Sequence, residues 1–332
     1  METADATEII ACLPKDRTLF WYHRDRYAAY LLEHAVQDNG SIATIKAGPY
    51  SRLLSRPAIK TVVASAGAGH ITSDELAMLW PTDPLCYRLT LGIWGDDQPF
   101  VWNQTSRRGS NLVLQLNFSN AHDSRYRDLI SHDPDYRPFD LHGHPTRRGF
   151  HTLAWARLDI NLNDGTALIE EVQTDWVRLA LHAREQMAAL AADPEAQRAA
   201  AETTYRGRRI SPDDLETYVR DVLNRHIPTW DEAILTAVLW FLWEELAVSH
   251  VWMHTADCGQ RLKRIHGTAP PRSLYSQLPR RFCFQETSEP PPFLDRKSSP
   301  AYRSLEKSGA LRFWRIDDPA RLPLPNQGSR PC

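Results

Sequence analysis

Residues 152–176 read TLAWARLDINL, NDG, TALIEEVQTDW, and this stretch decides the fold. Apolar and polar side chains alternate along Thr152–Leu162, which is typical of a half-buried strand. Asn163-Asp164-Gly165 is a strong tight-turn signal, and Thr166–Trp176 returns with the same alternation. The stretch therefore predicts a β-hairpin.

The returning strand carries an unusual row of polar side chains. Strict alternation puts Leu168, Glu170 and Val172 on one face. The other face carries Ile169, Glu171, Gln173 and Asp175. Two adjacent glutamates with a Gln and an Asp are costly in a strand, and such a row is suited to general acid–base chemistry. We expect Glu171, Gln173 and Asp175 to line a catalytic site.

Glu170 is expected on the packed face, between Leu168 and Val172. A carboxylate in that position must be paired or have a raised pKa. The alternative is structural: the polar face is simply solvent-exposed, and Glu170 pairs with an arginine such as Arg157.

The rest of the chain mixes helical and strand patterns. Apolar residues recur every three or four positions in Phe20–Val36, which predicts a helix, whereas the polar stretch Asp123–Thr146 predicts a long loop. Further strands are expected at Cys86–Trp94, Asn111–Phe118, His250–Thr255 and Cys283–Thr287, and further helices at Val177–Leu190, Trp230–Ser249 and Arg272–Phe282.

These elements predict an α+β or α/β protein with a mixed sheet and flanking helices. We divide it into a helical and β region over 1–145, an α/β domain over 146–290 with a helical insertion near 191–225, and a basic, Pro-rich segment over 291–332.

Composition excludes several classes of protein. With 42% hydrophobic and 24% charged residues, the 332-residue chain is neither disordered nor collagen-like. Its longest apolar run, near Ala233–Trp243, is too short to span a bilayer, and the acidic start has no signal-peptide pattern. Five scattered cysteines favour a reducing compartment. We therefore expect a cytoplasmic protein with no membrane partner.

Charge is unevenly distributed along the chain. Residues 261–332 hold 14 Lys and Arg against 6 Asp and Glu, a net charge of +8, which leaves −10 on residues 1–260. This segment is a predicted contact for nucleic acid or an acidic protein. The alternative is a solvated tail that folds back on its own acidic body.

The run Leu168–Trp176 (LIEEVQTDW) resembles a domain with an "IEEIQSDW" signature found in large polyvalent proteins of phages and mobile elements. The similarity extends over about 150–290, through VWMHTADCG at 251–259 and YSQLP at 275–279. Departures include Val172 for Ile and Thr174 for Ser. The resemblance implies a shared fold and no particular activity.

The order of elements is also similar to the acetyl-CoA-dependent N-acetyltransferase (GNAT) fold. That resemblance implies an acyl-CoA cofactor, a central-strand Glu as base and Tyr275 as general acid, although a buried core tyrosine is the alternative. The family's pyrophosphate loop is absent between Trp176 and Arg184. Its phosphate-binding role would then pass to Arg206, Arg208 and Arg209.

Histidines gather near the middle of the chain, in Asp140-Leu-His142-Gly-His144 and at His151. Such a pattern can hold zinc or iron, but a polar loop whose histidines cap and pair is the favoured explanation, and we expect no metal there. Three functions follow from the sequence: an acyltransferase-like enzyme, a mobile-element or host-interaction module that binds through its basic end, and a metal-dependent hydrolase that uses His142 and His144.

Overall fold

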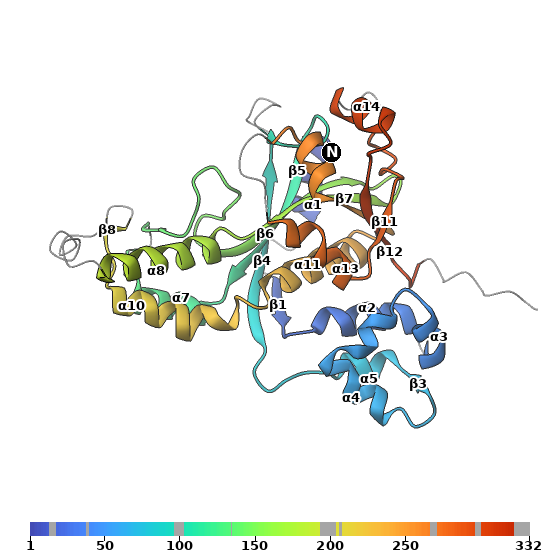
Figure 1. The fold of residues 1–332 in the computed structure, drawn as a ribbon, viewed down its shortest axis with the longest axis horizontal. Coiled ribbons are helices and arrows are strands. Elements are labelled where there is room, and N and C mark those ends of the chain that lie inside the picture. The colour runs from blue at the N-terminus through green and yellow to red at the C-terminus, as the bar shows by residue number, and fades with distance from the viewer. Residues whose placement is uncertain are drawn as a thin grey trace, which may run out of the picture.

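The computed structural model describes residues 1–12, 18–37, 40–95, 103–133, 135–192, 204–205, 208–265, 271–295 and 300–321. Its centre is one mixed sheet of eight strands in the order β1-β4-β5-β6-β7-β10-β12-β11 (Figure 1). The strands are β1 (Thr18–Tyr22), β4 (Leu85–Trp94), β5 (Asn111–Phe118), β6 (Thr152–Asn161), β7 (Thr166–Gln173), β10 (His250–His254), β12 (Phe313–Asp317) and β11 (Gln285–Thr287). The predicted mixed α/β class is confirmed.

All neighbouring strands of the sheet are antiparallel except β7 and β10, which are parallel. A parallel neighbour needs a crossover, and the described residues between β7 and β10 are mainly helical. The chain then returns through β11 to β12, which inserts between β10 and β11. The result is a mixed sheet with flanking helices.

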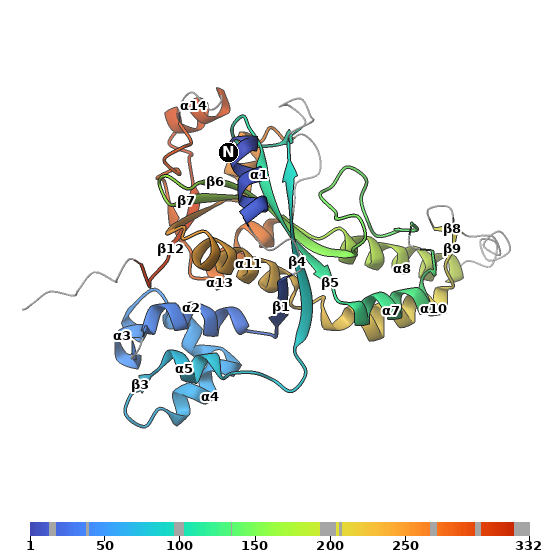
Figure 2. The same cartoon turned by 180° about the vertical axis from the view of Figure 1, so that it is seen from behind.

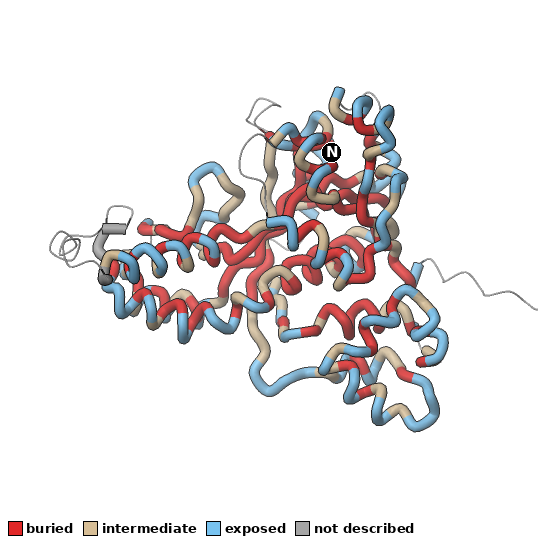
Figure 3. Tube along the Cα trace, viewed as in Figure 1, coloured by how far each residue is buried: buried red, intermediate tan, exposed pale blue. Residues whose placement is uncertain are grey.

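The central strands β5, β6, β7 and β10 are buried on both faces, whereas the edge strands β1 and β11 are partly exposed (Figure 3). Ile169 and Met253 belong to the larger core, which also takes up α11 (Trp230–Trp240) and its π-helical continuation η4 (Phe241–Glu245). Leu168 and Trp252 belong to a smaller core under α12 (Ala256–Leu262) and α14 (Pro300–Lys307). Burial on both faces explains why β7 and β10 are apolar on successive residues.

Helices form two groups beside the sheet, visible from both sides (Figures 1 and 2). One group follows β1 and lies below α11 in Figure 1; it contains α2 (Arg26–Val36), α3 (Ile42–Ala47), η1 (Ser51–Ser55), α4 (Pro57–Ser65), α5 (Ser73–Ala77) and the β2 (Gly40–Ser41)–β3 (His70–Ile71) pair. The other group extends from one end of the sheet as an arm; it contains α7 (Asn120–Leu129), α8 (Trp176–Ala192), α10 (Pro212–Thr217), η2 (Tyr218–Val222) and η3 (Leu223–Arg225).

The remaining helices are α1 (Thr3–Cys12), η5 (Arg272–Tyr275) and α13 (Gln277–Arg281), of which α13 lies beside α11 in Figure 1. The small pair β8 (Thr204–Tyr205) and β9 (Arg208–Arg209) belongs to the arm. In the part of the chain that the structure describes, no helix is both long enough and apolar enough to cross a bilayer.

The hairpin is confirmed as β6 and β7, and β4, β5, β10 and β11 fall within two residues of the predicted strands. Two predictions are wrong. Phe20–Tyr22 belong to β1, because their aromatic side chains pair across the sheet with β4, and the helix begins only at Arg26. Residues 120–129 form α7 rather than loop, because the otherwise polar helix buries His122 and Tyr126.

The predicted division at residue 145 falls between β5 and β6, which are neighbours in one sheet. It stays a prediction about folding units. The described residues of the predicted C-terminal segment include α14 and β12. Residues 300–317 are therefore an integral part of the fold.

Candidate functional site

The pairing of β7 with β10 ends where the carboxylates begin. Their parallel pairs run from Thr166–His250 to Ile169–Met253; β10 ends at His254, whereas β7 continues to Gln173. On the other side, Leu158 of β6 pairs with Ile169 and Arg157 pairs with Glu171, so Glu170 is an extra residue in a β-bulge. The bulge shifts the alternation: Val172 shares the larger core with Ile169, not a face with Leu168. The predicted face assignment is therefore wrong beyond Glu170.

Glu170 is fully buried and its carboxylate is fully bonded. One oxygen accepts the Ser106 backbone N–H at 2.9 Å; the other accepts the Ser106 hydroxyl at 2.9 Å and faces Nε2 of His254 at 3.1 Å. Burial by itself raises the pKa of Glu170, but the hydrogen bond and charge of His254 and the charge of Lys263 outweigh it and lower the pKa to about 2. Because the side chains of Glu170, Ser106 and His254 are all inaccessible to solvent, they form a buried structural cluster, which we call the buried anchor.

Glu171 is also buried, although its predicted role placed it on an open face. Its carboxylate pairs with Arg157 across the hairpin and lies 3.8 Å from Nζ of Lys263. Burial raises the pKa of Glu171, yet the charges of Lys263 and Arg157 prevail and lower it. Glu171 is therefore ionised and a weak base.

Beyond the last β7–β10 pair, two side chains from outside the sheet contact the β7 backbone. Nζ of Lys263 donates to the Glu170 carbonyl at 2.8 Å, and the Tyr275 hydroxyl accepts the backbone N–H of Val172 at 3.4 Å. Burial, and next the charge of Glu171, raise the pKa of Tyr275 well above its ordinary value. Tyr275 thus remains a protonated hydroxyl close to Glu171. The structure therefore brings together these two of the predicted site residues.

Gln173 and Asp175 form a second cluster further along the strand. Asp175 accepts from Nδ1 of His144 at 2.8 Å, from Nε2 of Gln173 at 2.8 Å and from the Trp155 indole at 3.2 Å, and it pairs with Arg178 of α8. Burial raises the pKa of Asp175, but the His144 hydrogen bond outweighs this and lowers it. The structure therefore separates the four predicted catalytic residues into two pairs.

A groove of about 630 Å³ lies outside the carboxyl end of β10. It is lined by the first residues of α12, by Tyr275 and Ser276, and by the connection from α14 to β12; we call it the α12–α14 groove. Three arginines line it: Arg261, Arg272 and Arg312. Arg272 pairs with Asp257 and Arg312 lies 3.9 Å from Glu286, whereas Arg261 makes no ion pair with any described residue. Crevices at the carboxyl ends of parallel strands are common ligand sites.

The other predicted binding residues lie elsewhere. Arg206 is outside the described residues, and Arg208 and Arg209 form β9, whose side chains are not described. His142 and His144 line a separate hollow of about 500 Å³. His151 instead bonds Asp123.

Sequence reasoning missed the cations and donors that surround the carboxylates. Lys263 has the pattern of a surface residue near the end of a short helix, and Ser106 lies in a segment without regular pattern. His254 carried a signal, as a polar residue at the end of the apolar strand His250–His254. Arg157 was named as a partner for Glu170, but it pairs with Glu171.

Fold and site together define a mixed α/β protein with an eight-stranded sheet, buried carboxylates at a strand bulge and an arginine-lined groove. Comparisons with protein-family models, with curated proteins and with solved structures found no match to this chain.

Proposed function

We propose that the chain is a group-transfer enzyme of the acyltransferase type that acts where the α12–α14 groove meets β7 beyond its last pair with β10. The observation that supports the proposal is the backbone N–H of Val172, which donates a long hydrogen bond of 3.4 Å to the hydroxyl of Tyr275, a side chain of the groove lining. A fixed backbone N–H beside a hydroxyl is the type of donor pair that binds an acyl carbonyl and the oxyanion that forms from it, once the carbonyl oxygen replaces the Tyr275 oxygen as acceptor.

Each residue then has a distinct role. The Val172 N–H binds the carbonyl oxygen of the acyl donor, and the Tyr275 O–H donates a hydrogen bond to the developing negative charge. Glu171 and Lys263 are positioning residues, because Lys263 bonds the Glu170 carbonyl of β7 and pairs with Glu171, and neither side chain is part of the groove lining. In the transfer, the acceptor amine bonds to the carbonyl carbon, the thiolate of the donor leaves, and the proton lost by the amine passes to solvent or to the thiolate.

The groove favours an anionic donor such as an acyl-CoA. Arg261 and the two paired arginines give its lining three positive charges against Asp257 and Glu286. These arginines would take the phosphate-binding role that the sequence assigned to Arg206, Arg208 and Arg209.

Binding and turnover test this function separately. A panel of acyl-CoA thioesters is titrated into the protein by calorimetry and thermal unfolding; a ligand at a hundred times its Kd should stabilise the fold by about 2.7 kcal/mol. Arg261→Gln should weaken binding at least tenfold, while Arg148→Gln, an exposed arginine in the other hollow, should not.

Tyr275→Phe should keep binding within threefold and reduce acyl transfer to a test amine about 100-fold. The matched control is Tyr27→Phe, which removes a buried hydroxyl that has no hydrogen-bond partner among the described residues. Absence of heat and of thermal stabilisation with every thioester would reject the proposal, as would full transfer activity in Tyr275→Phe.

A second function has one observation in its favour: the three groove arginines belong to the basic segment 261–332, which also suits nucleic acid. Binding of single-stranded DNA or RNA that falls steeply with salt and is lost in Arg261→Gln/Arg312→Gln would support it. Truncation is unsuitable as a test, because removal of residues after 296 would delete β12 from the sheet.

A further inference from the structure

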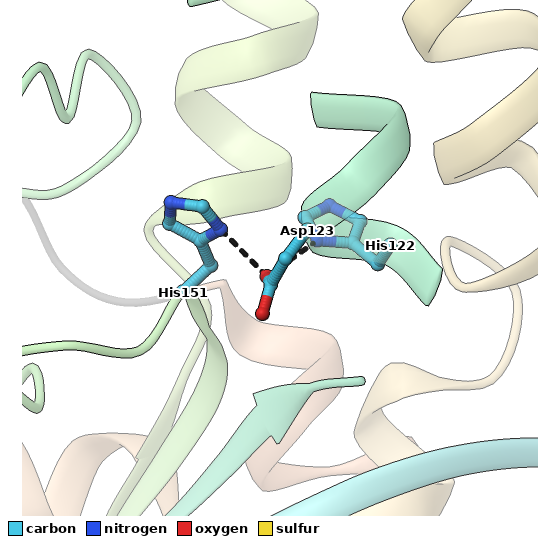
Figure 4. Close-up of side chains that lie close together, drawn as sticks. All are labelled: His122, Asp123 and His151. Carbon is cyan, nitrogen blue, oxygen red and sulfur yellow. Dashed lines mark hydrogen bonds and ion pairs between the residues drawn. The ribbon is translucent and has the colours of Figure 1, made fainter. Parts of the chain in front are cut away.

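Three metal-ligating side chains converge beside the arm, away from the α12–α14 groove. His122 and Asp123 lie in the first turns of α7, and His151 directly precedes β6 (Figure 4). One ligand atom from each lies within 4.8 Å of the other two. We propose that His122, Asp123 and His151 bind a divalent first-row transition-metal ion, with Zn²⁺ as the expected ion.

The fold brings these residues together from distant parts of the sequence. β5 and β6 are antiparallel neighbours, and the Phe118 N–H donates to the His151 carbonyl at 2.9 Å. The end of β5 therefore lies beside the start of β6. Because α7 begins two residues after Phe118, His122 and Asp123 lie beside His151, although Asp123 and His151 are 28 positions apart in the sequence.

The distances suit a shared ion. Nδ1 of His151 lies 2.8 Å from Oδ1 of Asp123, and Nδ1 of His122 lies 3.3 Å from the same oxygen. Ligands about 2.0–2.1 Å from a tetrahedral Zn²⁺ lie about 3.3–3.4 Å from one another. The His122–Asp123 edge already has this length, and the Asp123–His151 edge must widen by about 0.5 Å. The third edge, between the two imidazole nitrogens, lies within 4.8 Å.

Contacts outside the triangle hold the ligands in the required orientation. Nε2 of His122 lies 2.8 Å from the Tyr218 hydroxyl, and the His122 ring stacks on Phe118 with centroids 3.6 Å apart. With its proton on Nε2 and donated to Tyr218, His122 directs the lone pair of Nδ1 toward the proposed ion. Arg88 binds Oδ2 of Asp123 at 2.6 Å and leaves Oδ1 for the metal.

The three ligands are reachable from solvent, and their chemistry favours particular metal ions. His151 and Asp123 are partly exposed, with side chains at 13% and 19% of full exposure, so solvent reaches the open side of the triangle. Two imidazoles and one carboxylate favour zinc, iron, nickel or copper over Mg²⁺ and Ca²⁺, which prefer oxygen ligands. Three protein ligands leave at least one coordination position for water.

Metal content and a spectroscopic probe test the proposal. Full-length protein without an affinity tag is stripped with a chelator, dialysed against Zn²⁺, and assayed for bound metal and melting temperature; Co²⁺ is then substituted and its visible absorption recorded. We expect one equivalent of Zn²⁺, a higher melting temperature with Zn²⁺, no effect of Mg²⁺, and a Co²⁺ spectrum with nitrogen ligands.

Variants identify the ligands. His151→Gln and Asp123→Asn should each lose the bound metal, and His144→Gln, which removes a histidine that bonds Asp175 instead, should keep it. Should Asp123→Asn fail to fold, His151→Gln decides alone, because that side chain is partly exposed and its polar contact with the described residues is to Asp123. Less than a tenth of an equivalent in the unmodified protein, or a full equivalent in His151→Gln, would overturn the proposal.

Discussion

Replacement of Glu170 by Gln tests the buried anchor at the bulge. The substitution keeps the side-chain shape and removes its charge, although Ser106 and His254 remain arranged around an anion. A pKa lowered from 4.5 to about 2 corresponds to about 3 kcal/mol of folding stability at pH 7, at 1.36 kcal/mol for each pKa unit. Because Glu170 is fully buried, solvent does not screen this contribution. We therefore expect Glu170→Gln to lower the free energy of unfolding by about 3 kcal/mol.

The same pKa shift predicts how the effect of Glu170→Gln on the free energy of unfolding changes with pH. A carboxylate with a lowered pKa in the folded state stabilises the protein above its unfolded pKa of 4.5, and this stability is lost as pH falls toward the folded value of about 2. The difference between the unmodified protein and Glu170→Gln should thus shrink to about 2 kcal/mol at pH 3.5.

Urea unfolding followed by tryptophan fluorescence measures both quantities. Glu8→Gln is the matched control, because this exposed glutamate of α1 should change stability by less than about 0.5 kcal/mol. A loss below about 1 kcal/mol for Glu170→Gln at pH 7 would refute the assignment of an ionised, bonded carboxylate, and so would a difference that does not decrease with pH.

Two further predictions concern the buried histidines. Burial, reinforced by the charges of His122 and Arg225, lowers the pKa of His226 from 6.5 to about 3. Neutral His226 therefore favours the folded state fully above pH 6.5, and this stability is lost as pH falls. His226→Gln should remove about 2 kcal/mol of the stability change between pH 7 and pH 5; an unchanged dependence of the unfolding free energy on pH, measured by urea unfolding, would contradict this. Gly259→Ala places a methyl group 2.8 Å from Cβ of His254, so it should lower the free energy of unfolding by about 1–3 kcal/mol, measured against Gly67→Ala, where the added carbon meets nothing within 4 Å.

Local pattern was sufficient to predict most of the sheet. The turn at Asn163–Gly165 and the alternation on either side predicted β6 and β7, and β-branched and aromatic residues predicted β4 and β5. Phe20–Tyr22 failed because the helical spacing of Arg26–Val36 extends backward through them, and pairing with β4 is a long-range contact that local pattern does not contain.

The site was predicted in composition but not in arrangement. The carboxylates of β7 are unusual enough to be noticed, yet one extra residue at Glu170 changes which face each following side chain takes. A bulge leaves no local sequence signal here. The counter-charges of Lys263 and Arg157 arrive from α12 and β6, so their roles depend on the tertiary fold. The resemblance to the mobile-element domain stays a prediction.

The position of β12 has a consequence for how the protein is made. β12 is the last strand in the sequence but lies between β10 and β11, so β11 has no neighbour in the sheet until residues 313–317 emerge from the ribosome. At about 5–20 residues per second, the roughly 60 residues after β10 take about 3–12 s to synthesise. During that interval the edge of β10 is open and the smaller core is incomplete. The nascent chain is therefore exposed to intermolecular strand pairing at β10, and final closure of the sheet must follow synthesis of β12 rather than accompany that of the hairpin.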